Sequence, residues 1–199
     1  MNTIVLAGGN NCRIQMNKAL ARIGGKTIIE TIIGKLSPLF QRIIIVTNSK
    51  QEYEYLKKIS PQVDLTSDII AGKGPLGGIY SGLCGSDSQY NFVIGCDMPF
   101  LNTSLIQYMI ENLGEYDVVV PKVGDLLEPL YAIYSKECIK SIKKQLDLSN
   151  LSLRALFRDV RVKFIEDTEI EKFDQNHIAF FNINDAEDLE EAGRIADEI

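Results

Sequence analysis

The sequence predicts an α/β protein with one mostly parallel, doubly wound sheet. Up to residue 120, short apolar runs rich in β-branched residues alternate with helical patterns, which is the order of strands joined by crossover helices. These runs lack polar and apolar alternation, as expected when helices cover both faces of a sheet. No repeat, low-complexity tract or linker interrupts the 199 residues, so we expect a single domain spanning residues 1–199.

The individual elements follow from local patterns. Up to residue 120 we expect strands at 3–6, 42–46, 91–95 and 116–120, and helices at 27–36, 51–59, 76–84 and 103–113. The second half is less regular and predicts a strand at 128–135, helices at 136–146 and 152–158, an alternating segment at 160–166 and an apolar run at 177–183. A helix closes the chain, with Asn184 or Asp185 as its N-cap and acidic residues in its first turn.

Composition limits the classes of partner. The net charge is −6 and the basic residues are scattered, which argues against nucleic acid because a phosphate backbone requires a basic footprint. No apolar run approaches a membrane span and no signal peptide is recognisable. We therefore expect a cytoplasmic protein without a membrane partner. Reduced, inert thiols are expected, because the cysteines form no metal-binding pattern with one another or with the single histidine: Cys12, Cys84, Cys96, Cys138 and His177.

The stretch "TIVLAGGNNCRIQMNKAL" places two glycines directly after the first strand. Gly8 and Gly9 allow a sharp turn that brings backbone N–H groups close to an anion. Arg13 and Lys18 then offer positive charge to phosphate oxygens. The spacing matches neither GxGxxG nor the Walker pattern, so a glycine turn with solvated cations is the alternative interpretation.

The stretch "IIAGKGPLGGIYSGL" combines a glycine loop with a helix. Gly74 and Pro75 belong to the loop, and Gly77 and Gly78 weaken the following helix by roughly 1 kcal/mol each unless a close approach compensates. Asp68 stands at the mouth of this loop, where a turn or capping role is the alternative to ligand binding.

The stretch "VIGCDMPFL" brings Asp97 to the carboxyl end of a buried strand, and Pro99 prevents continuation of the ladder. Mg²⁺ binds through one or two carboxylates together with substrate phosphates, so this aspartate is a candidate magnesium ligand. The alternative is an N-cap of the next helix, but Asn102, Thr103 or Ser104 suit that role better.

Together these stretches resemble the molybdenum cofactor guanylyltransferase family. That family belongs to the nucleotidyltransferases with the GT-A-like, Rossmann-like fold of nucleotide-diphospho-sugar transferases. The matches run in order from residue 3 to residue 189 and comprise "LAGGNNCRIQMNKAL", "GGK" (24–26), "GPLGG" (74–78) preceded by Asp68, "CDMP" (96–99), "EPLYAIY" (128–134) and "NINDAEDL" (182–189).

The resemblance implies a role for each of these segments. Residues 1–101 would form the nucleotide-binding part, with Arg13 and Lys18 on the triphosphate and Asp97 on Mg²⁺. The other nucleotide-binding positions implied are Leu6, Ala7, Gly8, Gly9, Thr47 or Asn48, Asp68, Gly74, Pro75 and Leu76. Residues 102–199 would form the acceptor side, with Asn182 and Asn184 near the acceptor and metal. For Asn184, capping of the last helix is an equal alternative.

The resemblance also implies a reaction, in which a terminal phosphate of molybdopterin attacks the α-phosphorus of GTP and pyrophosphate leaves. The nucleophile is already an anion, so no Ser–His or Cys–His pair is required. Arg13, Lys18 and Asp97 are the catalytic candidates, the last through Mg²⁺. GTP and molybdopterin are the implied small-molecule partners, together with contacts to a molybdoenzyme or a cofactor-insertion protein; the oligomeric state is open.

One departure keeps other functions open. Gln15 stands where the family has glycine, and a backbone with positive φ there would cost about 1–2 kcal/mol. Substrate binding is therefore favoured over full catalytic competence, and a catalytically silent nucleotide-binding relative is one alternative. A cytidylyltransferase or another nucleotidyltransferase of this fold is the second. A nicotinamide-binding domain is disfavoured because GxGxxG is absent and "VTNS" ends the second strand where an acidic residue is needed.

Overall fold

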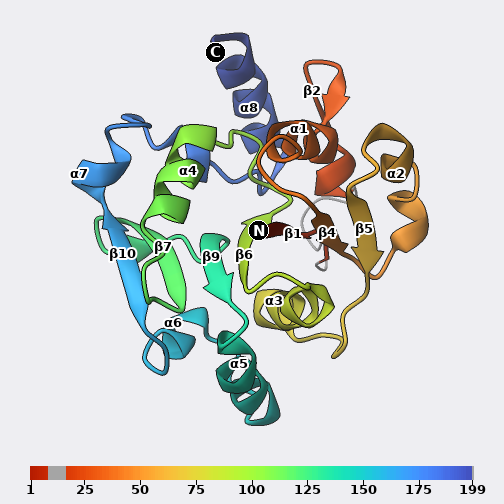
Figure 1. Cartoon of the computed structure of the whole chain (residues 1–199). Coiled ribbons are helices and arrows are strands. Elements are labelled where there is room, and N and C mark those ends of the chain that lie inside the picture. Colours follow the sequence, from red (N-terminus) through yellow and green to blue (C-terminus); the bar gives the residue numbers. More distant parts are fainter. Residues whose placement is uncertain (9–16, 199) are drawn as a thin grey trace.

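A computed structural model describes residues 1–8 and 17–198, which are organised around an eight-stranded sheet (Figure 1). The strand order is β10-β7-β9-β6-β1-β4-β5, and β8 pairs with β7 outside this path. The strands are β1 (Asn2–Leu6), β4 (Ile43–Val46), β5 (Val63–Thr66), β6 (Tyr90–Gly95), β7 (Val118–Val123), β8 (Leu126–Leu127), β9 (Tyr131–Ser135) and β10 (Val162–Glu166). A separate small sheet pairs β2 (Arg22–Ile23) with β3 (Lys26–Thr27).

The large sheet is mostly parallel, as predicted. β1 lies between β4 and β6 and is parallel to both, β5 is parallel to β4, and β10 is parallel to β7. β9 runs antiparallel to β6 and β7, and β8 runs antiparallel to β7. The start of β9 therefore lies at the same edge as the end of β6.

Helices cover both faces of the sheet, which confirms the doubly wound prediction (Figure 1). One face carries α3, α5 and α6, and the opposite face carries α1, α4 and α8. The α-helices are α1 (Ile28–Leu36), α2 (Leu56–Ile59), α3 (Gly74–Gly85), α4 (Thr103–Glu111), α5 (Cys138–Asp147), α6 (Leu153–Leu156), α7 (Asp167–Ile170) and α8 (Ala186–Glu198). Short 3₁₀ helices are η1 (Lys18–Leu20), η2 (Lys50–Glu52) and η3 (Ile178–Phe180). In the described part of the chain, no helix has the length and apolar character needed to span a bilayer.

Alternate residues of β1 explain its unbroken apolar sequence. Ile4 and Leu6 pack into the cluster under α3 and α5, whereas Val5 and Ala7 pack into the cluster under α1 and α4. Both faces of the strand are therefore buried, and every second residue supplies a different core.

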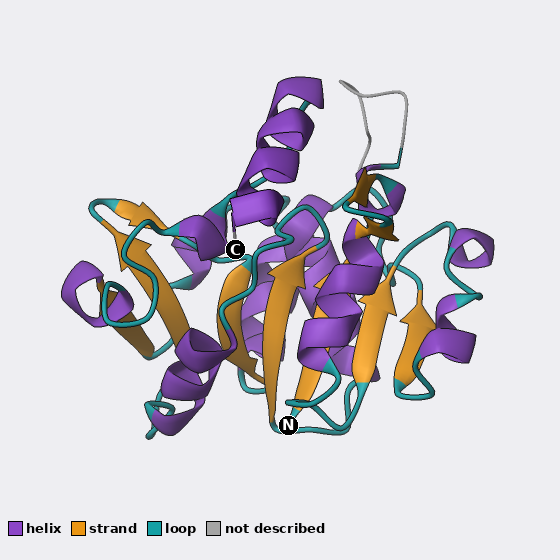
Figure 2. Ribbon diagram, turned by 90° about the horizontal axis from the view of Figure 1, so that it is seen from above, coloured by secondary structure: helices purple, strands orange, loops and turns teal. Residues whose placement is uncertain are grey.

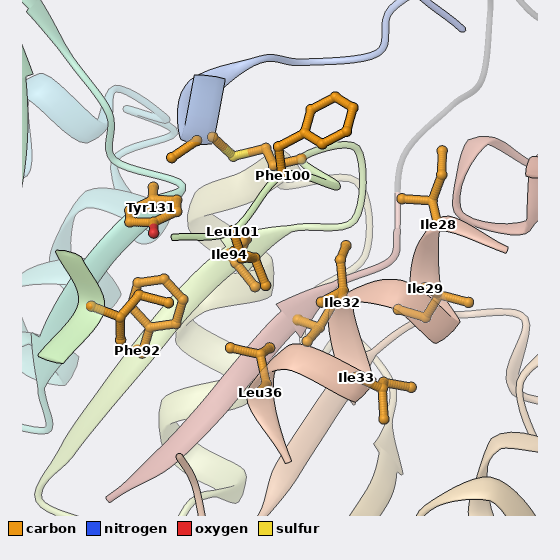
Figure 3. Packing of buried hydrophobic residues seen from close by; sticks show 14 of the residues in the cluster. Ile28, Ile29, Ile32, Ile33, Leu36, Phe92, Ile94, Phe100, Leu101 and Tyr131 are labelled. Atoms are coloured by element: carbon orange, nitrogen blue, oxygen red, sulfur yellow. The ribbon is translucent and has the colours of Figure 1, made fainter. Parts of the chain in front are cut away.

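The helix α1 forms because of its burial and its cap. Its sequence "IIETIIGKL" is rich in isoleucine, a mediocre helix former. Burial of each isoleucine against the sheet contributes about 2 kcal/mol, and Ile28 and Ile32 lie in this packed layer (Figure 3). Thr27 completes a capping box with Glu30, which satisfies two backbone donors at the start of the helix.

The glycines of α3 allow this helix to approach β1 closely. A Cβ at Gly82 would lie 2.5 Å from Cγ2 of Ile4, and one at Gly78 would lie 3.0 Å from Cδ2 of Leu6. The close packing of α3 on β1 compensates for the helix stability that these glycines lose. It fixes α3, and therefore the glycine loop that precedes it, against the central strand.

Several elements differ from the predictions. The expected helix 51–59 is divided into η2 and α2, because the backbone around the fully buried Tyr53 forms successive turns, in which Tyr53 N–H donates to the Lys50 carbonyl and Leu56 N–H to the Tyr53 carbonyl. The expected strand 128–135 begins only at Tyr131, whose N–H donates to the Glu128 carbonyl in a turn. The apolar run 177–183 contains η3, and the edge strand β5 was not predicted.

The predicted caps are confirmed in two places. The Asn102 side chain accepts from the N–H of Leu105 at the start of α4. At α8, the Asp185 carboxylate accepts from the N–H of Asp188 at 3.0 Å, so Asp185 rather than Asn184 is the N-cap.

We expect Gly82→Ala to lower the free energy of unfolding by about 1–3 kcal/mol, because the new methyl group overpacks against the buried Ile4. Gly34→Ala is the matched control, since Gly34 lies at an exposed position of helix α1 with no atom within 4 Å of an added Cβ. It should raise stability by up to about 1 kcal/mol. Urea titration measures both, and equal stability of the two variants would contradict the close α3–β1 contact.

Candidate active site

The carboxyl ends of four parallel strands meet at one edge of the sheet, where the central arrowheads point in Figure 2. Backbone hydrogen bonds extend the ladder past the strand ends, so the following loops start side by side. These bonds run from Ala7 N–H to Val46 O at 2.9 Å, from Thr47 N–H to Thr66 O at 2.9 Å and from Cys96 N–H to Leu6 O at 3.1 Å. Ligands of open α/β sheets bind at this type of edge.

Three predicted residues from three different loops come together here. The Asn48 amide donates to a carboxylate oxygen of Asp68 at 3.0 Å, and the Asp68 N–H donates to the Asn48 side-chain oxygen at 3.2 Å. A Cβ at Gly8 would lie 4.0 Å from the same carboxylate. Of the alternative pair Thr47 and Asn48, Thr47 is buried and its hydroxyl accepts from Ser49 N–H, whereas the Asn48 side chain is exposed beside Asp68.

The glycine loop before α3 lies beside this group. Gly72 and Gly74 have φ of 72° and 57°, the left-handed region that favours glycine. Pro75 stands in the first turn of α3, followed by the fully buried Leu76. The Ser81 hydroxyl accepts from Ile69 N–H at 2.8 Å, which ties the segment after Asp68 to α3.

Asp97 lies at the end of β6, as predicted. Burial raises the pKa of its carboxyl group, and a backbone N–H and the Lys18 ammonium group partly offset that rise. The positive charge of Lys18 therefore acts on Asp97, although no ion pair joins these two catalytic candidates among the described residues. A desolvated carboxylate with one nearby cation is poised to accept further positive charge.

Two residues that the sequence analysis did not single out position this pair. A Cβ at Gly95 would lie 2.5 Å from Oδ1 of Asp97, so glycine leaves the space that the carboxylate occupies. Asn17, which precedes Lys18, exchanges hydrogen bonds with the Tyr53 hydroxyl at 2.8 and 3.1 Å. The glycine immediately before "CD" at a strand end was a usable sequence signal; the Asn17–Tyr53 pair had none.

The two predicted acceptor residues flank a contact to Asp97. The Ile183 N–H donates to the Asp97 carbonyl at 2.9 Å. Asn182 donates to the Phe180 carbonyl at 2.9 Å, and the Asn184 side chain donates to the Asn182 carbonyl at 3.3 Å. Because Asp185 caps α8, the Asn184 side chain does not serve as that cap.

The donor set fits a substrate-bridged Mg²⁺ rather than a protein-only metal cage. Within residues 1–8 and 17–198, no group of three or more His, Cys, Asp or Glu side chains could hold a metal ion. Asp97 is the carboxylate at the end of β6, and Mg²⁺ typically adds substrate phosphates and waters to one or two such ligands.

Four positions of the sequence analysis lie outside the described residues: Gly9, Cys12, Arg13 and Gln15. A surface hollow between α3 and α5 contains none of the predicted site residues; it is lined by Tyr80, Ile139, Lys140, Lys143, Lys144, Asp147 and Leu148.

The comparison with protein families shows to which family this chain belongs. The model of the MobA-like NTP transferase domain matches residues 3–165. The chain belongs to the MobA-like NTP transferase family. It is therefore an enzyme, a nucleotidyltransferase, and the matched region contains Gly8, Asp68 and Asp97.

Curated MobA-like relatives cover nearly the whole chain. A probable molybdenum cofactor guanylyltransferase of Peptoclostridium acidaminophilum is 34% identical over 99% of this chain and 90% of its own length. A molybdenum cofactor guanylyltransferase of Desulfosudis oleivorans is 31% identical over 95% of this chain and 92% of its own length.

Solved structures agree with the GT-A-like fold. The molybdopterin-guanine dinucleotide biosynthesis protein A of Archaeoglobus fulgidus has a TM-score of 0.85 at 27% identity, over 100% of both chains. The 4-diphosphocytidyl-2C-methyl-D-erythritol synthase of Anaerococcus prevotii has a TM-score of 0.72 at 15% identity over 98% of this chain and 95% of that one, which shows the fold alone.

The site environment predicts a selective thiol reactivity. Burial raises the pKa of Cys96 and of Cys138 to about 12, so at pH 8 only about 10⁻⁴ of each is the reactive thiolate. Cys84 is exposed. In a Cys12→Ser background, we expect iodoacetamide at pH 8 to modify the exposed Cys84 quickly, the half-buried Cys96 more slowly and the buried Cys138 only after unfolding, as measured by peptide mass spectrometry. Rapid labelling of Cys138 in the folded protein would contradict this burial, and labelling in urea is the positive control.

Proposed function

We propose that this protein transfers GMP from GTP to molybdopterin in an Mg²⁺-dependent reaction that releases pyrophosphate. The observation that carries the proposal is the position of Asp97 just past the end of β6, at the edge of the sheet where the loops meet. On one side of it lie Gly8, Asn48 and Asp68, and the segment around Ile183 is hydrogen-bonded to Asp97 itself. The names of the MobA-like relatives supply the substrate class.

The nucleotide belongs, in this proposal, to residues 1–101. Backbone groups of Leu6, Ala7, Gly8 and Gly9 face the triphosphate, which Arg13 and Lys18 also contact. The nucleoside side is formed by the remaining predicted positions, namely Thr47, Asn48, Asp68, Gly74, Pro75 and Leu76. The reciprocal Asn48–Asp68 hydrogen bonds support this, because they pre-organise two polar side chains at the strand edge.

The acceptor belongs to residues 102–199, with Asn182 and Asn184 beside it. Their segment is tied to the Asp97 carbonyl through Ile183, so an acceptor held there has its reacting phosphate near Asp97. Proximity of this kind replaces a bimolecular encounter with an oriented one. Contacts with a molybdoenzyme or a cofactor-insertion protein, and a cytoplasmic location, stay predictions.

The chemistry needs charge neutralisation more than proton transfer. The acceptor phosphate is an anion, so the site requires no general base and the single histidine is no obstacle. Mg²⁺ bound by Asp97 would supply Lewis-acid stabilisation of the phosphates. Lys18 holds a fixed positive charge beside the same carboxylate, where it stabilises negative charge moving onto the pyrophosphate. Arg13 is proposed to act with it.

Nucleotide selectivity separates the guanylyl proposal from the cytidylyl alternative. We expect GTP with Mg²⁺ at 100 times its Kd to raise the free energy of unfolding by about 2.7 kcal/mol. CTP and ATP at the same concentration should stabilise the protein less, because their bases present different hydrogen-bonding edges. Thermal unfolding with each nucleotide measures this, and equal shifts for all three would remove the guanylyl assignment.

Activity tests the site residues and separates an enzyme from a silent relative. With GTP, Mg²⁺ and molybdopterin, we expect equal amounts of pyrophosphate and dinucleotide. Lys18→Ala and Asp97→Asn should each lower kcat by about 100-fold or more. Gly95→Ala should also lower activity at nearly unchanged stability, because its methyl group displaces the carboxylate of Asp97.

Lys143→Ala is the matched control for the loss of a cation, since Lys143 pairs with Asp147 on the surface of α5. Equal losses in all four variants would contradict local coordination of the phosphates. GTP binding without any pyrophosphate from the wild-type protein would favour the silent relative, and Gln15→Gly would then be expected to restore turnover.

A further inference from the structure

A carboxylate outside the predicted site stands at the same edge of the sheet. Glu128 precedes β9, and its own N–H donates to the Pro121 carbonyl while its carbonyl accepts from Tyr131 N–H, both at 3.0 Å. Two residues later, the Leu130 carbonyl accepts from Gly95 N–H at 3.0 Å. The backbone around Glu128 is therefore fixed to the end of β6, and β6 ends two residues before Asp97.

The Glu128 side chain is partly buried without a compensating partner. In the described part of the chain, no hydrogen bond or ion pair involves its carboxyl group, although its backbone is fully engaged. Burial raises the pKa of this carboxyl, and no cation among the described residues offsets that rise. A desolvated carboxylate without a donor is unfavourable in a free protein, and a ligand that brings N–H donors would satisfy it.

The strand order places Glu128 on the acceptor side of Asp97. β9 borders β6 on one side, while β1, β4 and β5 follow on the other. With about 4.8 Å between neighbouring strands, the start of β9 lies roughly 14 Å from the end of β4, where Asn48 meets Asp68. A ligand group at Glu128 is thus separated from the proposed nucleoside positions by the whole reaction centre.

We propose that Glu128 recognises the 2-amino-4-oxopyrimidine edge of the pterin ring by accepting two parallel N–H hydrogen bonds. This inference rests on the proposed function and deepens it, because it assigns the ring-binding residue of the acceptor. The N3–H and the 2-amino group of a pterin point in the same direction, and the two oxygens of a carboxylate accept such a pair in the fork geometry familiar from arginine.

Charge favours the ring over the phosphate as the partner of Glu128. Molybdopterin is an anion through its phosphate, and a carboxylate beside that phosphate would repel it. The pterin ring presents N–H donors and no negative charge at this edge. Glu128 therefore fits the ring end of the acceptor, whereas Lys18 and Asp97 serve the phosphate end.

Guanine carries the same donor edge as a pterin, so the test must distinguish the two sources. Lumazine differs from pterin by an oxo group in place of the 2-amino group, and inosine triphosphate differs from GTP by loss of the 2-amino group. We expect the wild-type protein to bind pterin about 10- to 100-fold more tightly than lumazine, the discrimination of one bidentate pair. Quenching of pteridine fluorescence at saturating Mg²⁺ and GDP measures both affinities.

Glu128→Gln is the decisive variant because its carboxamide matches lumazine. Its N–H donates to the 2-oxo group and its oxygen accepts from N3–H, so the preference for pterin should be lost or reversed while GTP-over-ITP selectivity persists. Glu111→Gln is the matched control, since Glu111 is exposed at the end of α4, and it should bind like the wild type. The Glu128→Gln protein should unfold at no lower temperature, because a desolvated charge has been removed.

Each negative result shows whether this inference or the proposed function is wrong. Unchanged preference for pterin in Glu128→Gln overturns this inference and leaves the proposed function standing. Loss of GTP-over-ITP selectivity in Glu128→Gln, with pterin preference intact, also overturns it and assigns Glu128 to guanine. Binding of neither pteridine by the wild-type protein, together with normal GTP binding, overturns the acceptor class in the proposed function and this inference with it.

Discussion

Parallel pairing of β1 with β4 and β6 is the interaction on which the rest of the structure depends. It places β1 at the centre of the sheet, where helices bury both of its faces, and brings three loops to one edge of the sheet. The glycines of α3 then let that helix lie directly on Ile4 and Leu6, so the glycine loop before α3 is fixed relative to the same edge. Accordingly, the position of the site follows from the packing of a single central strand.

The sequence predicted those elements whose stability is local or whose burial is complete. β1, β4 and β6 are buried on both faces, and such runs stand out in any sequence. β5 was missed because it is an edge strand whose partly exposed residues include Asp64 and Thr66. The helix expected at 51–59 is divided where the buried side chain of Tyr53 reaches the distant Asn17, and no local sequence pattern predicts a contact between residues so far apart in the chain.

The candidate site, too, was predictable from the sequence only in part. Asp97 was predictable because a buried strand ends just before it, and the motifs around Gly8 and Asp68 indicated that their loops would meet. Glu128 was part of a quoted motif, but its significance depends on its position beside β6 and on a carboxyl group that has no partner among the described residues, which only the fold reveals. The space that Gly95 leaves for Asp97 likewise depends on three-dimensional geometry. The roles proposed for all of these site residues, Arg13 and Gly9 included, stay predictions.

The hydrogen bond from Ile183 to the Asp97 carbonyl has a consequence for the modularity of the enzyme. The family model matches the chain up to residue 165, yet the loop that carries Asp97 is hydrogen-bonded to Ile183, beyond that point. A fragment trimmed to residue 165 would lose the last residue of β10 and this hydrogen bond. Residues beyond the matched region therefore help to hold the loop of Asp97 in place.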